Sequence, residues 1–294
     1  MKVLVTGGNG FTGKYVVSAF EAAGYQVLVG GRSSPSSKKE VIFDILDKGC
    51  LRETLSLHKP DGVIHLAGSA FVGEGDSSVF YRNNTIGTIN LLEAVKESGI
   101  DVNKIIISSS ANIYGNPATS VINENVEPMP VNHYSSSKLA MENMVKGWFS
   151  EFPIIITRPF NYTGVGQNVE FLVPKIVSHF KRNCDIIELG NIDVQRDFSD
   201  VSEIAICYLK LFDSKHSSTT VNLCSGVSTS LDKIIKEMTD ISGRKIEVKV
   251  NPDFVRNNEI KILCGDNSRL KNMINFAPSG ELRSTLENMF NSSM

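Results

Sequence analysis

The feature that most constrains the fold is a glycine-rich turn that joins an apolar run to an amphipathic stretch in the first residues of the chain. The sequence reads MKVLVTGGNGFTGKYVV, which predicts a buried strand over residues 2–6 and a helix over residues 13–23 that ends at Gly24. Glycine permits a tight turn and a close backbone approach, and the first N–H groups of a helix bind anions. The segment therefore predicts a strand, a phosphate-binding turn and a helix, the unit that opens a dinucleotide-binding sheet.

Beyond this unit, short apolar runs alternate with longer amphipathic stretches. The runs show no polar alternation, so we expect strands that are covered on both faces, in a doubly wound, Rossmann-type parallel sheet of the α/β class. After residue 160 the pattern loosens, which indicates a smaller, mixed α/β substrate-binding cap. We expect residues 1–160 to bind NAD(P) and residues 161–294 to bind the substrate, within one compact, interleaved unit. The predicted strands cover residues 2–6, 26–30, 40–43, 62–66, 104–108, 153–158, 186–189, 220–224 and 246–250, and the predicted helices cover residues 13–23, 77–98, 133–151, 169–182, 202–212, 229–241 and 281–293.

Composition and charge exclude several other classes. The 294 residues carry a net charge of −2, and Lys38-Lys39 is the longest basic run, which gives no nucleic-acid or membrane surface. No run approaches the ~18 apolar residues of a membrane span, and the first segment is typical of a buried strand rather than a signal peptide. The five cysteines lack CxxC spacing and the five histidines lack ligand spacing. We therefore expect reduced, mostly buried thiols and no metal site in a cytoplasmic protein.

The end of the second predicted strand bears on the choice of cofactor. NAD-binding chains usually carry an acidic residue there, which holds the ribose hydroxyls. Here the segment is GGRSS, residues 30–34, with no carboxylate to repel a 2′-phosphate, so we expect NADP, with NAD as the alternative. The alternative for Arg32 is a solvated loop residue. Asp44, after the third predicted strand, is expected either to contact the adenine or to cap the next helix.

A tyrosine and a lysine in HYSSSKLAMENM lie one helical turn apart. Tyr134 and Lys138 share one helix face because their spacing is i, i+4. A free tyrosine titrates near ~10, and a nearby ammonium favours the phenolate and lowers that pKa. The run Ser108, Ser109 and Ser110 follows a predicted strand at the carboxyl edge of the sheet, where ligands bind. This spacing also occurs by chance, but together with the glycine turn and the serine run it predicts an acid-base site.

These motifs resemble those of the extended short-chain dehydrogenases/reductases, the NAD(P)-dependent nucleotide-sugar epimerase/dehydratase family. TGGNGFTG, VIHLAG, NNTIGTINLLEAV, SSSANIYG, YSSSK and RPFNYTGVGQ follow one another as in that family between residues 6 and 167. The resemblance implies that Ser110 hydrogen-bonds the substrate, that Tyr134 is the acid-base residue and that Lys138 activates it. The resemblance implies that His65 borders the cofactor, whereas strand periodicity alone predicts a packed strand-end histidine. Asn84 is also expected to tether the backbone near the site. The residues expected to border the cofactor are Gly7, Gly10, Phe11, Thr12, Gly13, Arg32, Asp44, Ile45, Leu66, Ala67, Gly68, Asn84, Tyr134, Lys138 and Pro159.

The second half resembles one subgroup of this family, the reductases of GDP-linked 4-keto-6-deoxy sugars. The similarity lies in GNIDVQRDFSDV, VNLCSG and LCGDNSRL, across roughly residues 158–273. It implies that Asn161, Arg196 and Arg256 bind the nucleotide diphosphate of the substrate, with Ser110 at the sugar. Arginine suits this task because its planar fork makes bidentate bonds to phosphate oxygens.

The residues themselves leave alternatives open in this half. Arg196 can pair with Asp197 or Asp200, and Arg256 can be a solvated loop residue. The chain also departs from the subgroup after this arginine, because Asn257-Asn258 stands where a proline and then an aspartate are usual.

Members of this family share a hydride-transfer step and differ in the further catalytic groups that their reactions require. A 4,6-dehydratase needs an acidic pair after the serine, and Ala111 and Asn112 stand there instead, so dehydration is not expected. We expect NAD(P)H-dependent reduction of the C4 ketone of a GDP- or dTDP-linked 4-keto-6-deoxyhexose, for surface polysaccharide. The alternatives are a UDP-hexose 4-epimerase with tightly bound NAD and a non-catalytic dinucleotide-sensing protein. The resemblance also implies a homodimer, formed by the helices near 77–98 and 134–150.

Overall fold

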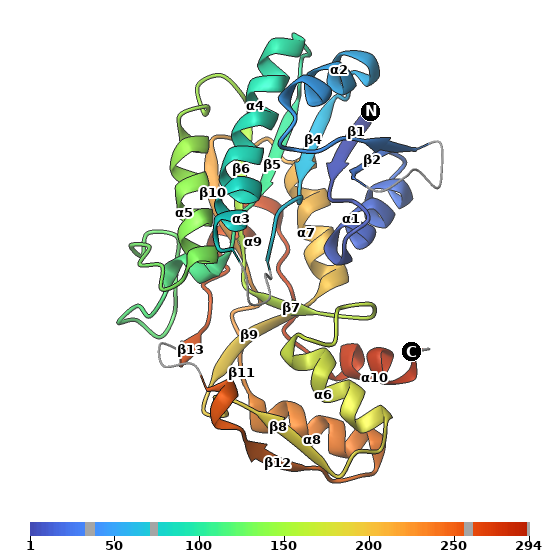
Figure 1. Cartoon of the computed structure of the whole chain (residues 1–294), viewed down its shortest axis with the longest axis vertical. Coiled ribbons are helices and arrows are strands. Elements are labelled where there is room, and N and C mark those ends of the chain that lie inside the picture. Colours follow the sequence, from blue (N-terminus) through green and yellow to red (C-terminus); the bar gives the residue numbers. More distant parts are fainter. Residues whose placement is uncertain (33–38, 71–75, 256–260, 293–294) are drawn as a thin grey trace.

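The computed structural model describes residues 1–32, 39–70, 76–255 and 261–292, which form a large sheet with helices and a smaller cap (Figure 1). The large sheet has seven parallel strands in the order β10-β6-β5-β4-β1-β2-β3. The strand order reverses at β1, where β2 and β3 extend the sheet to one side and β4 begins the other. The strands of this sheet are β1 (Lys2–Thr6), β2 (Gln26–Gly31), β3 (Glu40–Ile42), β4 (Gly62–His65), β5 (Lys104–Ser108), β6 (Ile154–Pro159) and β10 (Thr219–Leu223).

Both faces of this sheet are buried, which accounts for the unbroken apolar runs. Val3 and Val5 of β1 face the core formed with helices α1 and α7, whereas Leu4 faces the core formed with α2, α4 and α5. The predicted Rossmann-type, doubly wound sheet is therefore confirmed. The helices that cover it are α1 (Phe11–Ala22), α2 (Lys48–His58), α4 (Gly87–Ser98), α5 (His133–Lys146), α7 (Val201–Asp213) and α9 (Ser268–Ile274).

Three features of this part differ from the prediction. Helix α2 was not predicted, because only Leu51 and Leu55 of it are buried and its apolar stripe is narrow. The single helix predicted over residues 77–98 is instead a short α3 (Ser78–Phe80), a π-helical segment η1 (Tyr81–Ile86) and α4. The predicted helix over residues 133–151 ends earlier, at Lys146, and the chain turns there.

The second half of the chain is shared between the large sheet and the cap. Correcting the prediction, β10 and α7 belong to the large sheet and its core, although both follow residue 160. The remaining segments form the smaller mixed α/β cap, in which β9 pairs antiparallel with β11 and parallel with β7 and β13. No helix in the described part of the chain has the length and apolar character that a membrane span requires. The cap contains β7 (Asn161–Thr163), β8 (Ile186–Leu189), β9 (Gln195–Asp200), β11 (Ser228–Ser230), β12 (Glu247–Val250), β13 (Ile262–Leu263), α6 (Leu172–Lys181), α8 (Leu231–Ser242) and α10 (Arg283–Asn291).

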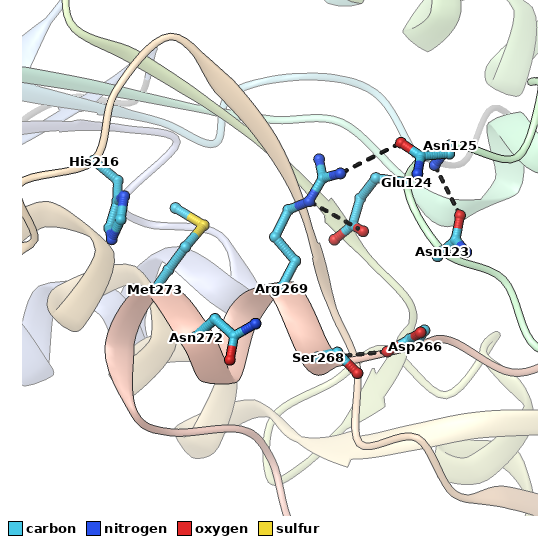
Figure 2. A pocket seen from close by; sticks show the side chains of 9 residues that line it. All are labelled: Asn123, Glu124, Asn125, His216, Asp266, Ser268, Arg269, Asn272 and Met273. Carbon is cyan, nitrogen blue, oxygen red and sulfur yellow. Dashed lines mark hydrogen bonds and ion pairs between the residues drawn. The ribbon is translucent and has the colours of Figure 1, made fainter.

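Side chains close the open edge of the large sheet at β10. Asn222 N donates to Glu124 Oε1 at 2.8 Å, and Arg269 Nη1 donates to Thr220 O at 2.8 Å. Arg269 also faces Glu124, with 3.4 Å between Nε and Oε2 (Figure 2). These bonds satisfy backbone groups that an edge strand would otherwise offer to another chain. The hollow drawn in Figure 2 therefore belongs to this edge, and none of the described residues that line it is a predicted catalytic residue.

Candidate active site

The glycine turn leaves room that any side chain would fill. Gly7 has a φ of +69°, and a Cβ there would lie 2.9 Å from Ala67 N. A Cβ on Gly13 would lie 2.2 Å from Gly7 O, so the turn closes only with glycine at both positions. Gly10 precedes α1, and no side chain of the described residues caps that helix start. The N–H groups of the first turn are thus directed at a cradle that fits the pyrophosphate of a dinucleotide.

A row of buried side chains joins β1 and β4 to α4 beneath this turn. His65 Nδ1 lies 2.7 Å from Thr6 Oγ1, and His65 Nε2 lies 2.9 Å from Thr88 Oγ1. Burial, together with the positive charge of Lys138, lowers the pKa of His65 to about 3, so the ring is neutral. The prediction that His65 is a packed strand-end residue is confirmed.

Asn84 holds the backbone that follows β4. Its Oδ1 accepts from Ser69 N at 2.8 Å, and its Nδ2 donates to Ser69 O at 3.1 Å and to Ser137 Oγ at 3.0 Å. The predicted tether is therefore present, and it reaches α5 as well. A Cβ on Gly68 would lie 2.6 Å from Asn84 Oδ1 and 3.6 Å from Lys138 Nζ, so this backbone passes directly beside the lysine.

Ser110, Tyr134 and Lys138 converge at the carboxyl edge of the large sheet. Asn132 and Ser135 form a capping box that starts α5, so Tyr134 lies in its first turn and Lys138 one turn later. The Ser110 side chain, which follows β5, lies close enough to the Tyr134 phenol to lower its pKa. Lys138 Nζ donates to Ser108 O at 2.8 Å. The structure thus brings together the three side chains that the sequence places on separate segments.

The residues predicted to bind substrate have different outcomes. Asn161, on β7, has a buried Oδ1 without a hydrogen-bond partner among the described residues. A ligand that binds there would supply the missing hydrogen bond. Arg196 is buried on β9, and its Nη1 donates to Gln195 O at 2.8 Å and to Lys261 O at 3.3 Å. Asp197, offered as its alternative partner, instead accepts from Ser225, Gly226 and Gly265, and Asp200 caps α7. Arg256 lies outside the described residues.

Comparison with known proteins assigns the chain to a family. The family described as "NAD dependent epimerase/dehydratase family" matches residues 3–224. The chain belongs to this family. It is thus an NAD(P)-dependent enzyme of the extended short-chain dehydrogenase/reductase type, as the motifs predict.

Three similar proteins show how far the likeness extends. A GDP-6-deoxy-D-talose 4-dehydrogenase of Aggregatibacter actinomycetemcomitans is 36% identical over 292 residues, which cover 99% of this chain and 97% of that protein. A GDP-6-deoxy-D-mannose reductase of Pseudomonas aeruginosa is 31% identical, over 97% of this chain and 94% of that protein. The solved structure of RMD from Pseudomonas aeruginosa complexed with NADPH matches with a TM-score of 0.87 and 29% identity, over 98% of this chain and 97% of that one.

The predicted effect of Lys138 on the pKa of Tyr134 needs a correction. The sequence predicts that Lys138 lowers the pKa of Tyr134, but burial raises this pKa to about 12, and the nearby Ser110 hydroxyl offsets only part of that rise. Burial also lowers the pKa of Lys138 to about 8, and the negative charge of Glu142 acts in the opposite direction. Desolvation outweighs the charges here, because Lys138 is buried and Tyr134 is half-buried at the sheet edge. Tyr134 is thus a protonated phenol near neutral pH.

The remaining predicted cofactor residues lie where the enzyme's sheet ends. Arg32 is exposed after β2. Asp44 accepts from Leu46 N at 2.9 Å, whereas Asp47 caps α2, so Asp44 is not the helix cap. Ile45 packs in the core. Leu66 and Ala67 follow β4, and Pro159 ends β6, and each is at the carboxyl edge.

Sequence reasoning missed several residues of this enzyme's site. Arg158 on β6 binds Glu142 with two hydrogen bonds of 2.9 and 2.7 Å, and both side chains are buried. Glu142 lies one turn beyond Lys138 in α5. Tyr162 hydrogen-bonds Thr12 with 2.8 Å between the hydroxyl oxygens. The RPFNYTG motif contains both Arg158 and Tyr162, so this motif is the sequence signal that could have identified them.

No metal-binding cluster of three histidine, cysteine or acidic side chains occurs in the described ranges. All five cysteines are free, and Cys207, Cys224 and Cys264 are buried, whereas Cys50 and Cys184 are half-buried. The prediction of mostly buried thiols is confirmed.

Proposed function

We propose that the enzyme uses NADPH to reduce the C4 ketone of a GDP-linked 4-keto-6-deoxyhexose, with a 6-deoxytalose-type product destined for surface polysaccharide. The observation that carries this proposal is the convergence of Ser110, Tyr134 and Lys138 next to the backbone that borders the glycine turn. The names of the two relatives, both of which specify GDP-6-deoxy sugars, support the nucleotide and the sugar class.

Each of the three side chains has a defined task. NADPH supplies the hydride when it is bound. Tyr134 remains protonated because burial raises its pKa to about 12, and it donates this proton to the oxygen that gains negative charge at C4. Ser110 donates to the same oxygen and stabilises the charge as it forms. Lys138, fixed by Ser108 O, lies one helical turn from Tyr134 and helps to return a proton to it.

The end of β2 supports NADPH over NADH. Gly31 ends the strand and the exposed Arg32 follows, so these two positions offer no carboxylate to repel a 2′-phosphate. On the substrate side, Asn161 and Arg196 are proposed to bind the diphosphate, and Arg256 stays a prediction from the resemblance.

A UDP-hexose 4-epimerase has the same fold and differs only in what happens to the hydride, because an epimerase returns it to the sugar. A dinucleotide-sensing protein is less well supported, since the complete set of Ser110, Tyr134 and Lys138 is present. The homodimer through α4 and α5 also stays a prediction, which sedimentation velocity tests.

The test is a panel of GDP-, dTDP- and UDP-linked 4-keto-6-deoxyhexoses, with NADPH absorbance followed over time. We expect the GDP-linked sugar to be reduced fastest, with one NADPH consumed per product. The proton coupling between H3 and H4 in the product gives the configuration at C4. Tyr81→Phe serves as a matched control for Tyr134→Phe, because Tyr81 contacts His133 at the start of the same helix. Bound NAD with no net cofactor consumption would overturn the proposal in favour of an epimerase.

A further inference from the structure

A tyrosine that no prediction assigned connects the cap to the start of α1. The Tyr162 hydroxyl lies 2.8 Å from Thr12 Oγ1, although the two residues are 150 positions apart. Its ring also stacks on Phe11, with ring centroids 6.2 Å apart and an angle of 12° between planes. One turn later in α1, Tyr15 donates to Val165 O at 2.8 Å. The first turns of α1 are thus attached to β7 and to the loop that follows it.

Tyr162 lies near both the glycine turn and the Tyr134 phenol. Thr12 is the second residue of α1 and is flanked by Gly10 and Gly13, so it belongs to the turn that cradles an anion. Tyr162 is also close enough to Tyr134 to contribute to the raised pKa of that phenol. Tyr162 is also the neighbour of Asn161, whose buried Oδ1 has no partner among the described residues.

The two hydroxyls of this pair hold one hydrogen more than their mutual bond uses. Each hydroxyl carries one hydrogen, so the oxygen that accepts in the Tyr162–Thr12 bond keeps its own hydrogen for another acceptor. Within the described ranges, neither hydroxyl has a second hydrogen-bond partner. A half-buried donor of this kind gains most from a charged acceptor, because charge-assisted hydrogen bonds are roughly twice as strong as neutral ones.

We propose that Tyr162 is a positioning residue for the cofactor, which fixes the Thr12 hydroxyl so that the pair donates one hydrogen bond to the pyrophosphate. The threonine side chain has few χ1 states, and the bond to the phenol favours one of them. The same contact links the turn to β7, the strand of Asn161. This inference requires only that the chain binds a dinucleotide, so it does not depend on the proposed sugar substrate.

Tyr162→Phe tests this directly, because it removes the hydroxyl and keeps the ring on Phe11. We expect the Kd for NADP, measured by isothermal titration, to rise about 10- to 150-fold, as for the loss of one hydrogen bond to a charged group. Thr12→Val should give a similar rise. The double variant should be little worse than either single variant, because the two hydroxyls act as one unit. Adenosine 2′-monophosphate, which lacks the pyrophosphate, should bind all variants equally.

Tyr15→Phe is the matched control, since it deletes a phenol bond between the same helix and the same loop but away from the turn. Its Kd for NADP should stay within about twofold of the parent protein, and thermal unfolding shows whether each variant is folded. If Tyr162→Phe fails to fold, Thr12→Val alone decides. The inference is overturned by an unchanged Kd in Tyr162→Phe and Thr12→Val, by an equal loss in Tyr15→Phe, or by an equal loss of adenosine 2′-monophosphate binding.

Discussion

Replacing Gly13 by alanine tests whether backbone contact shapes the cofactor turn. The new Cβ would lie 2.2 Å from Gly7 O, 2.6 Å from Gly8 Cα and 2.7 Å from Gly8 C. All three neighbours are backbone atoms, so no side-chain rotation relieves the overlap. To reach an ordinary C···O separation of ~3.3 Å, the turn must open by about 1 Å.

The size of the effect follows from the cost of such overpacking, about 1–3 kcal/mol. The free variant relaxes by moving Gly7 and Gly8, and binding must then restore the shape that fits the pyrophosphate. Because about 1.4 kcal/mol corresponds to a tenfold change, the Kd for NADPH should rise about 5- to 150-fold. Titration of the variant with NADPH, followed by the fluorescence of the bound nicotinamide, measures this directly.

Gly24→Ala, at the other end of the same helix, is the control. Gly24 has a φ of +87°, and nothing lies within 4 Å of the Cβ position. The substitution therefore strains the backbone by about 1–2 kcal/mol and lowers the melting temperature, but it leaves the Kd for NADPH unchanged. The reasoning is refuted if Gly13→Ala binds NADPH as tightly as the parent protein, or if both variants lose the same affinity.

Three further predictions concern buried charge and pH. Glu142→Gln leaves the buried Arg158 without its carboxylate, so urea denaturation should show a loss of about 3–5 kcal/mol in the free energy of unfolding, and a loss below about 1 kcal/mol would contradict this. The pKa of His65 is about 3 in the folded state, whereas a histidine in the unfolded chain titrates near ~6.5, so the unfolded chain binds the extra proton between these two values. The free energy of unfolding should then fall by up to about 1.4 kcal/mol per pH unit as pH drops below ~6.5. His65→Asn should reduce this slope, as measured by denaturation at several pH values. Equal slopes for the parent protein and His65→Asn would contradict this prediction. Because the pKa of Lys138 is lowered to about 8, kcat/KM for reduction should decline as pH rises through 8 and the ammonium is lost, whereas a flat profile well above that pH would exclude a role for its charge.

The parts of the fold that local pattern determines were predictable from sequence. Strands such as β1 and β5 are continuous apolar runs, because both faces of the sheet are covered, and the glycine turn identifies the helix after β1. The strands β7, β11 and β13 have two or three residues and exist only through their pairing with β9. Their sequences carry no period that a local pattern could reveal.

The site was predictable in its members but not in its electrostatics or its distant contacts. Ser110, Tyr134 and Lys138 could be found because their motifs are local. The pKa of Tyr134 could not be predicted, since it depends on how deeply the folded chain buries the phenol. The contact of Tyr162 was equally hidden, because its partner Thr12 lies 150 residues away and only the fold joins them.

The central claim is that Ser110, Tyr134 and Lys138 direct a single reduction at C4. The most direct measurement uses NADPH deuterated at its transferable position with the GDP-linked 4-keto-6-deoxyhexose, and locates the deuterium in the product by NMR. The account predicts one deuterium at C4 for the parent protein, and a loss of about 10²- to 10⁴-fold in rate for Tyr134→Phe with unchanged NADPH binding. Deuterium at another carbon, no transfer at all, or full activity in Tyr134→Phe would contradict it.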